Sequence, residues 1–266
     1  MIESSARHTV SASSDNLEAP ALKGDGVAIV RRAKDVLYES GAERNGSRVC
    51  VTLAYAQSLD GCIAAGVGRS TPISCKQSLV LTHNLRAIHD AILIGVNTAL
   101  LDDPQLNVRL VEGDDPRPVV VDSRLRISPD ARIFNRRDAR PIIATTEQAN
   151  ARKAAKLADK GADVLRIPPN GAGRVDLFIL FDRLRQLGIR SLMVEGGARI
   201  ITSVLSSQLA NQLVLTISPT ILGGVRAVEL PNGMPLQTKP RLNNVYACSL
   251  GGDLIVHGEF EPSHDS

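Results

Sequence analysis

The chain has 266 residues, a formal net charge of +3 and 3% aromatic residues with no tryptophan, which argues against a nucleic-acid partner bound through basic blocks or stacking surfaces. Four cysteines without a C-x-x-C pair and five histidines without ligand spacing argue against a disulfide framework and a bound metal. No apolar run approaches the length of a bilayer span and no signal-peptide pattern opens the chain, so we expect a cytoplasmic protein with no membrane partner.

The N-terminal part of the chain changes character at about residue 27. Residues 1–26 are rich in Ser, Ala, Asp and Gly without periodicity, and we expect a disordered tail. Val27 to Ser40 has helical spacing of its apolar residues and is followed by Gly41. We therefore expect an N-terminal helix and linker at 27–46, one domain at 47–261 and a short tail at 262–266.

A strand, a helix and a second strand follow in the next stretch. Residues 48–54 alternate apolar side chains as a strand does, and Asp60 belongs to the turn chemistry that closes it. Ser74 is a plausible N-cap for a helix at 75–89. The short apolar run at 91–94 suits a strand buried on both faces. This order predicts a βαβ unit with parallel strands.

Strands and helices continue to alternate through the rest of the chain. Further strands are predicted at 118–121, 141–144, 163–167, 191–194 and 212–218, with helices at 148–160, 176–187 and 198–207. Alternating patches at 245–260, around two glycines, indicate a terminal hairpin. The pattern predicts an α/β fold with a mostly parallel central sheet that ends in antiparallel C-terminal strands.

Polar residues gather directly after the strand at 91–94. Thr98, Asp102 and Arg109 lie in this stretch, and ligands bind beyond the carboxyl ends of strands in open α/β sheets. The sequence Asp102-Asp103-Pro104 is also typical of an ordinary turn. On these residues alone both interpretations stay open.

A glycine pair stands between the predicted strand at 191–194 and the helix at 198–207. Gly196 and Gly197 follow Glu195, and such a pair lets a diphosphate approach the backbone N–H groups at a helix N-terminus. The alternative is a tight strand-to-helix turn with a capping Glu. The loop at 66–70 has a G-x-G without a third glycine, which is a weak dinucleotide signal.

The polar groups at the predicted strand ends include anion binders and carboxylates but no nucleophile–base pair. The chain has no G-x-S-x-G and no Walker G-K-[ST]. Hydrolysis through a covalent intermediate and P-loop phosphoryl transfer are therefore poor interpretations. A reaction in which a cofactor supplies the reactivity fits better, because the protein then needs only to bind and orient its ligands.

Four segments in this order resemble one family. They are YAQSLDG at 55–61, LTHNLRAIHDAILIGVNTALLDDPQLNVR at 81–109, VVVDS at 119–123 and MVEGG at 193–197. The chain resembles the RibD C-terminal family over about residues 47–260, that is, the pyrimidine reductases of riboflavin biosynthesis. The resemblance implies a dihydrofolate-reductase-like fold of three layers, α/β/α.

The resemblance also implies an NADPH-dependent homodimeric oxidoreductase. Such an enzyme reduces the ribosylamino side chain of a 5′-phosphorylated pyrimidinone to a ribitylamino side chain by hydride transfer to C1′. Cofactor contacts are implied at Ala56, Ser74, Thr98, Asp102, Ser123, Gly196, Gly197, Ala198, Arg199, Ile200, Ile201, Thr202 and Ser203. Substrate contacts are implied at Ser70, Arg86, Leu106, Arg109 and Glu195, with Glu195 and Asp60 as catalytic carboxylates.

Two positions depart from the bacterial bifunctional members of this family. Ala54 stands where those members usually carry Lys, and Pro72 stands where they carry Trp. These departures resemble the stand-alone fungal and archaeal-type reductases, which act on the 2,5-diamino pyrimidinone before deamination. In keeping with this, no H-x-E or P-C-x-x-C deaminase motif precedes the domain.

Several interpretations of function stay open at this point. The substrate is either the diamino or the deaminated 5-amino pyrimidine. A catalytically silent relative that binds a nucleotide, and a reductase of another pterin or pyrimidine metabolite, are the alternatives to the riboflavin reductase.

Overall fold

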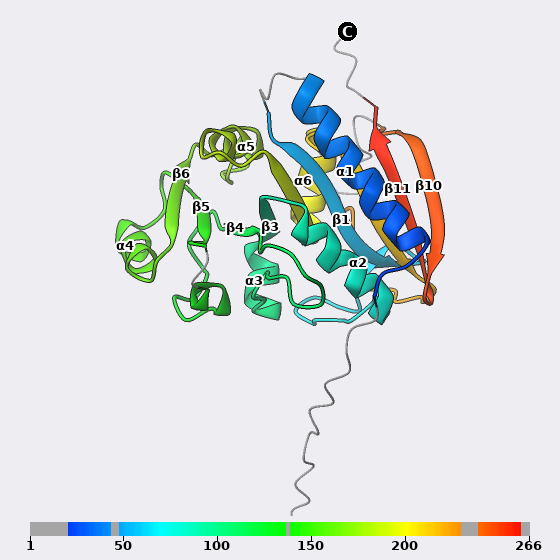
Figure 1. The fold of residues 1–266 in the computed structure, drawn as a ribbon. Coiled ribbons are helices and arrows are strands. Elements are labelled where there is room, and N and C mark those ends of the chain that lie inside the picture. Colours follow the sequence, from blue (N-terminus) through cyan, green and yellow to red (C-terminus); the bar gives the residue numbers. More distant parts are fainter. Residues whose placement is uncertain (1–20, 44–47, 137–138, 230–238, 262–266) are drawn as a thin grey trace, which may run out of the picture.

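The computed structural model describes residues 21–43, 48–136, 139–229 and 239–261 (Figure 1). Its strands are β1 (Cys50–Ser58), β2 (Cys62–Ala64), β3 (Ala91–Gly95), β4 (Arg117–Val121), β5 (Ile142–Thr146), β6 (Asp163–Ile167), β7 (Ser191–Gly196), β8 (Gln212–Ser218), β9 (Val225–Arg226), β10 (Leu242–Leu250) and β11 (Asp253–Phe260). Its α-helices are α1 (Asp25–Glu43), α2 (Lys76–Ala87), α3 (Val96–Asp102), α4 (Ala151–Asp159), α5 (Leu177–Gln186) and α6 (Ala198–Ser206).

A nine-stranded sheet forms the centre of the described chain. The strand order is β10-β11-β8-β1-β7-β3-β4-β5-β6. The strands from β8 to β6 are parallel, whereas β11 pairs antiparallel with β8 and β10 pairs antiparallel with β11. The expected fold class, a mostly parallel sheet that ends in antiparallel C-terminal strands, is confirmed.

Helices cover both faces of the sheet, which gives the three layers. The helices α1 to α4 pack on one face and α5 and α6 on the other (Figure 1). Strand β3 is buried on both faces. Leu93 belongs to the core under α5 and α6, while Ile92 and Ile94 belong to the core on the opposite face. A strand buried on both faces must be apolar at every position.

Most predicted elements are present within a few residues of their expected bounds, but one local prediction was wrong. Cys75, not Ser74, is the N-cap of α2, and its N–H is bonded to Asp253 Oδ2 over 2.8 Å. The chain after β3 continues directly into α3, and only Asp103 turns, in a left-handed conformation with φ 39°. The β2–β9 pair and the short 3₁₀ helix Arg132–Asn135 were not predicted.

The described residues include only part of the expected tails and linker. Helix α1 begins at Asp25, two residues before the expected start of the helix at Val27. Residues 1–20, 44–47 and 262–266 of the expected tails and linker lie outside the described residues.

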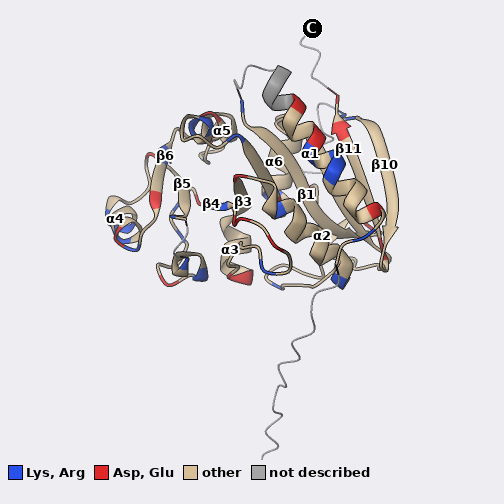
Figure 2. Ribbon diagram, viewed as in Figure 1, with Lys and Arg blue, Asp and Glu red and all other residues tan. Residues whose placement is uncertain are grey.

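Charged residues of both signs are interspersed over the described elements (Figure 2). Among the described helices, none is long and apolar enough to cross a membrane. In the same part of the chain, no group of three or more His, Cys, Asp or Glu side chains is arranged to hold a metal ion.

The N-cap of α5 offers a test of how the sequence defines this helix. Asp176 accepts hydrogen bonds from the N–H groups of Phe178 and Ile179 over 2.9 and 3.2 Å. Asp176→Ala should lower the free energy of unfolding by about 1 kcal/mol, because two helix-end donors lose their acceptor. Urea unfolding measures the change. The matched control is Asp182→Ala on the exposed side of the same helix, and equal losses in the two variants would contradict the prediction.

Candidate active site

A two-pronged ion pair joins α2 to β7 at the carboxyl end of the sheet. Arg86 Nε donates to Glu195 Oε1 over 2.5 Å, and Arg86 Nη2 donates to Glu195 Oε2 over 2.7 Å. Both side chains are mostly buried, with 11% and 14% of their surfaces exposed. Met193 of β7 belongs to the core that α2 shares. Glu195 follows two residues later, where the register of β7 against β3 shifts between the pairs Leu93–Val194 and Ile94–Gly196.

The loop after α3 brings a third group to this ion pair. The carbonyl oxygen of Asn107 accepts a hydrogen bond from Arg86 Nη1 over 2.9 Å. The preceding Leu106 is buried and has φ 54°. Arg136 holds the loop, because its Nη1 donates to the carbonyl oxygens of Leu106 and Pro116 over 2.9 and 3.0 Å. The loop conformation is thus tied to the guanidinium of Arg86 at one side and to that of Arg136 at the other.

His83 lies one turn before Arg86 and connects α2 to the same loop. Its Nδ1 accepts the backbone N–H of Arg109 over 3.1 Å, so Nδ1 carries the lone pair. Burial, together with the charges of Arg86 and Arg109, lowers the pKa of His83 from 6.5 to about 3. His83 is therefore a neutral acceptor near neutral pH, and it orients the backbone at Arg109.

The two arginines expected at the substrate have different environments. Arg86 is buried and bonded to Glu195 and Asn107. Arg109 is exposed, and its Nη1 donates to the neighbouring Asn107 Oδ1 over 3.2 Å. The site therefore combines a guanidinium that fixes a carboxylate with a second one that is open to solvent.

The glycine turn before α6 lies against α3. Gly197 has φ 90°, and a Cβ at this position would be 3.0 Å from Thr98 Oγ1. Gly196, with φ 135°, also has a conformation that other residues rarely adopt. The first N–H groups of α6 have no partner within the helix, and a helix N-terminus favours an anion. Three of the predicted cofactor residues, Thr98, Gly196 and Gly197, are thus brought together.

The other predicted cofactor residues lie in varied surroundings along the same edge. Ile200, Ile201 and Thr202 of α6 are buried, and the N–H groups of Ile200 and Ile201 donate to the carbonyl oxygen of Gly197 over 2.8 and 3.0 Å. Ser123 follows β4, and its Oγ accepts the N–H of Val175 over 3.1 Å. Asp102 is exposed at the end of α3. The remaining cofactor and substrate candidates are partly buried or exposed; these are Ala56, Ser70, Ser74, Ala198, Arg199 and Ser203.

Asp60 is committed to the turn after β1. Its carboxylate accepts hydrogen bonds from Ser58 Oγ and from the N–H groups of Leu222 and Gly223, the latter two over 3.1 and 2.7 Å. These bonds, that from Ser58 first, hold the pKa of Asp60 well below its usual range. The pairing of β1 with β7 ends at Leu53, seven residues before Asp60. These contacts hold the carboxylate of Asp60 in the turn, and its expected catalytic role stays a prediction.

Comparison with known proteins shows the family of this chain. The model of the RibD C-terminal domain matches residues 49–256. The chain belongs to the RibD C-terminal domain family. It is 39% identical over 215 residues to the 2,5-diamino-6-ribosylamino-4(3H)-pyrimidinone 5′-phosphate reductase of Methanothermobacter thermautotrophicus, covering 79% of this chain and 97% of the relative.

Two further members of this family show how widely the likeness extends. The riboflavin biosynthesis protein RibD of Aquifex aeolicus is 34% identical over 259 residues, covering 89% of this chain and 68% of the relative. A solved structure of the riboflavin biosynthesis reductase of Saccharomyces cerevisiae superposes with a TM-score of 0.66 at 28% identity, covering 86% of this chain and 99% of that chain.

Position 54 carries Ala in this RibD-type domain, where Lys is expected in the bacterial bifunctional members. Ala54 is 5% exposed and packs in the cluster that holds Met193. It follows Leu53, whose partner on β7 is Val194, the residue before Glu195. In this chain Arg86, from α2, supplies the positive charge beside Glu195.

Sequence reasoning missed the residues that hold the site in place. His83, Asn107 and Arg136 were assigned no role from the sequence. Asn107 could have been noticed, because it lies between Leu106 and Arg109 in a segment that was already singled out. Arg136 gave no signal, because its contacts lie about 20 and 30 residues away in the sequence.

The pH dependence of stability tests the neutral state of His83. A histidine whose pKa is 6.5 unfolded and about 3 folded contributes stability that is lost as the pH falls from 6.5 towards 3, because the unfolded chain binds the proton first. Between about pH 7 and about pH 5 the wild type should therefore lose more unfolding free energy than His83→Gln, which keeps an acceptor for the Arg109 N–H. Urea unfolding at both pH values measures this difference, and parallel losses would contradict it.

Proposed function

We propose that this chain is the pyrimidine reductase of riboflavin biosynthesis. Its substrate is a pyrimidinone that carries a ribosylamino side chain with a 5′-phosphate, and its product carries a ribitylamino side chain. The observation that carries the proposal is the meeting of a carboxylate fixed by Arg86 with a glycine turn at a helix N-terminus, in a chain of this family.

The residues around the glycine turn fit a nicotinamide dinucleotide. A side chain at Gly197 would approach Thr98, so the turn leaves backbone rather than side chain at this edge. The N-terminus of α6 favours the negative charge of a diphosphate. We assign NADPH to Thr98, Gly196, Gly197 and the start of α6, with Asp102 and Ser123 at the border. NADPH, when bound, supplies the hydride that the residues of this chain cannot supply.

The remaining residues bind and orient the substrate. The phosphate carries close to two negative charges near neutral pH, and the exposed guanidinium of Arg109 offers it charge-assisted hydrogen bonds, each worth about 1.5–3 kcal/mol. Ser70 and Leu106 are assigned to the same substrate. Glu195 faces the ribosylamino end and stabilises the positive charge that develops there. Arg86 holds the Glu195 carboxylate in one orientation, which is a positioning role rather than the substrate contact that the resemblance implies.

The diamino pyrimidinone is the favoured substrate. Ala54 and Pro72 resemble the stand-alone reductases, and the relative from M. thermautotrophicus is named for that substrate. We also propose NADPH dependence, a homodimer and a cytoplasmic location, as is usual for the family. Oxidation of NADPH assayed with the diamino and with the deaminated substrate tests the proposal. Turnover of neither would favour the two alternatives, a silent nucleotide-binding relative or a reductase of another metabolite.

Arg109 provides the sharpest test of substrate binding. Arg109→Ala should raise the KM for the pyrimidine substrate about tenfold to a hundredfold, at about 1.4 kcal/mol per decade, and leave the KM for NADPH nearly unchanged. Arg109→Lys should recover only part, because Lys lacks the bidentate fork. Steady-state kinetics on folded variants measures both constants.

Glu195 serves as the contrasting variant in the same assay. Glu195→Gln should lower kcat more than it raises the KM for substrate, since the lost charge acts mainly on the transition state. Unchanged constants for Arg109→Ala would remove the phosphate assignment. An effect of Glu195→Gln on KM alone would remove the charge-stabilising role.

The glycine turn can be tested by adding a single methyl group. Gly197→Ala should weaken NADPH binding by about tenfold or more, because the new Cβ stands beside Thr98 where we place the cofactor. Gly188→Ala is the matched control, since Gly188 has a similar φ of 86° but no heavy atom within 4 Å of a Cβ. Fluorescence titration with NADPH compares the two, and equal affinities would overturn the cofactor assignment.

A further inference from the structure

A chain of hydrogen bonds between buried side chains crosses the interior on the α1 side of the sheet. His89 Nδ1 lies 2.6 Å from the carbonyl oxygen of Leu85, and His89 Nε2 lies 2.7 Å from Thr52 Oγ1. Gln212 Nε2 donates to Thr52 Oγ1 over 2.9 Å, and Gln212 Oε1 lies 3.0 Å from His257 Nε2. The last member, His257, is 1% exposed.

The direction of every bond in this chain is determined by its partners. Gln212 Nε2 also donates to the carbonyl oxygen of Ala33 over 3.1 Å, which fixes the orientation of the amide. Gln212 Oε1 is then an acceptor, so His257 Nε2 must carry the hydrogen. Burial lowers the pKa of His257, so the ring is neutral near neutral pH. His257 Nδ1 therefore holds a lone pair, and it has no hydrogen-bond partner.

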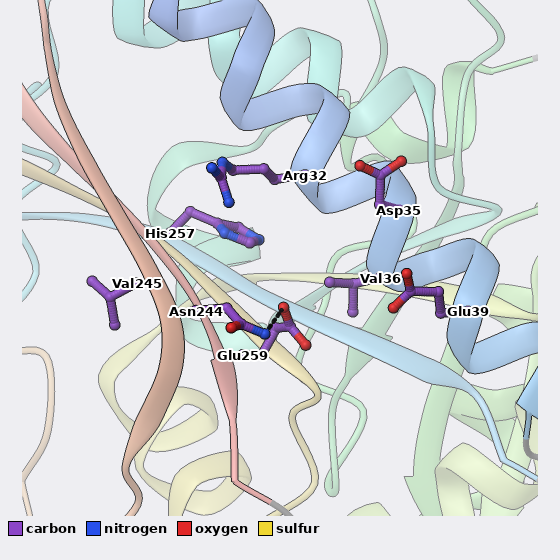
Figure 3. A pocket seen from close by; sticks show the side chains of 8 residues that line it. All are labelled: Arg32, Asp35, Val36, Glu39, Asn244, Val245, His257 and Glu259. Atoms are coloured by element: carbon purple, nitrogen blue, oxygen red, sulfur yellow. Dashed lines mark hydrogen bonds between the residues drawn. The ribbon is translucent and has the colours of Figure 1, made fainter.

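The unpartnered His257 belongs to the wall of a pocket between α1 and the C-terminal hairpin (Figure 3). The pocket has a volume of about 380 Å³. Its lining carries three carboxylates and one guanidinium; the eight lining residues are Arg32, Asp35, Val36, Glu39, Asn244, Val245, His257 and Glu259. The guanidinium is already engaged, since Arg32 lies over the ring of Tyr246 at 4.5 Å from its centroid.

The backbone shapes this pocket through an irregularity in the hairpin. The register of β10 against β11 shifts between Asn243 and Tyr246, and Asn244 takes a left-handed conformation with φ 51°. Asn244 Nδ2 donates to Glu259 Oε1 over 2.9 Å, which holds this carboxylate at the pocket (Figure 3). Bulges of this kind re-aim side chains and are frequent at functional sites.

We propose that this pocket binds a small organic cation that carries primary ammonium groups. An ammonium offers N–H donors to the lone pair of His257 and positive charge to Asp35, Glu39 and Glu259. A metal ion fits less well, because the described residues contain no cluster of three or more metal-ligating side chains. A single water is much smaller than the pocket, since it fills about 30 Å³. The pocket volume also lies within the range of about 300–1,000 Å³ that small-molecule sites occupy.

Calorimetric titration of the full chain with butane-1,4-diamine tests the proposal. Butane-1,4-diol is the uncharged probe of the same length. The diamine should bind and the diol should not. The nitrogen-15 resonance of His257 Nδ1 should move on addition of the diamine, because a lone pair that accepts a hydrogen bond changes its environment. Equal heats for the two probes, or a resonance that the diamine leaves unmoved, would overturn the proposal.

Substitutions of the pocket-lining carboxylates Asp35 and Glu259, here called the rim variants, keep the buried His257 intact and so avoid a folding defect. Glu259→Gln and Asp35→Asn should each weaken diamine binding about tenfold, as loss of one charge-assisted contact does. Asp182→Asn on the distant helix α5 is the control for non-specific charge effects and should bind as the wild type does. Unchanged affinity in both rim variants, or an equal loss in the control, would show that the diamine binds elsewhere.

Discussion

The ion pair between Arg86 and Glu195 is the interaction on which the candidate site depends. Two charges are taken largely out of water here, which is favourable only when the geometry is good and the remaining hydrogen-bonding groups are satisfied. The pair meets this condition through its two prongs and through the bond from Arg86 to the carbonyl oxygen of Asn107. It thereby links a helix, a central strand and the loop that carries Arg109. Removal of one partner from such a pair typically costs about 3–5 kcal/mol, so position and stability are coupled at this place.

A neutral histidine supports the same arrangement from α2. His83 stands between two guanidinium groups and can accept a hydrogen bond only because burial keeps it uncharged. Two further neutral histidines, His89 and His257, are the two ends of a separate series of hydrogen-bonded side chains. Gln212 in the middle of this series donates to the carbonyl oxygen of Ala33 and so ties α1 to the sheet. Buried polar groups are tolerated where each finds a partner. In this series of hydrogen-bonded side chains, the acceptor without a partner is Nδ1 of His257, and His257 lines a pocket rather than the packed core.

Much of the fold could be predicted from local signals. The strand at 91–94, the helix at 176–187 and the strand at 212–218 were each predicted from the residues within them, and all three elements are present. The pairing of β2 with β9 could not be found in this way, because the strands are two or three residues long and far apart in the sequence. The same holds for the N-cap of α2, where Asp253 of the hairpin, rather than the local Ser74, reaches the helix end.

The sequence by itself determined the class of fold, the family and the place of the glycine turn, because periodicity, turn residues and ordered segments are properties of neighbouring residues. Only the tertiary structure decided what each polar side chain does. Arg86 and Glu195 are 109 residues apart, and nothing in either segment predicts that one would neutralise the other. The carboxylate of Asp60 accepts hydrogen bonds from the N–H groups of Leu222 and Gly223, about 160 residues away in the sequence, and no pattern around Asp60 predicts these bonds. Sheet register and helix packing bring such groups together, and neither is written in the spacing of residues along the chain.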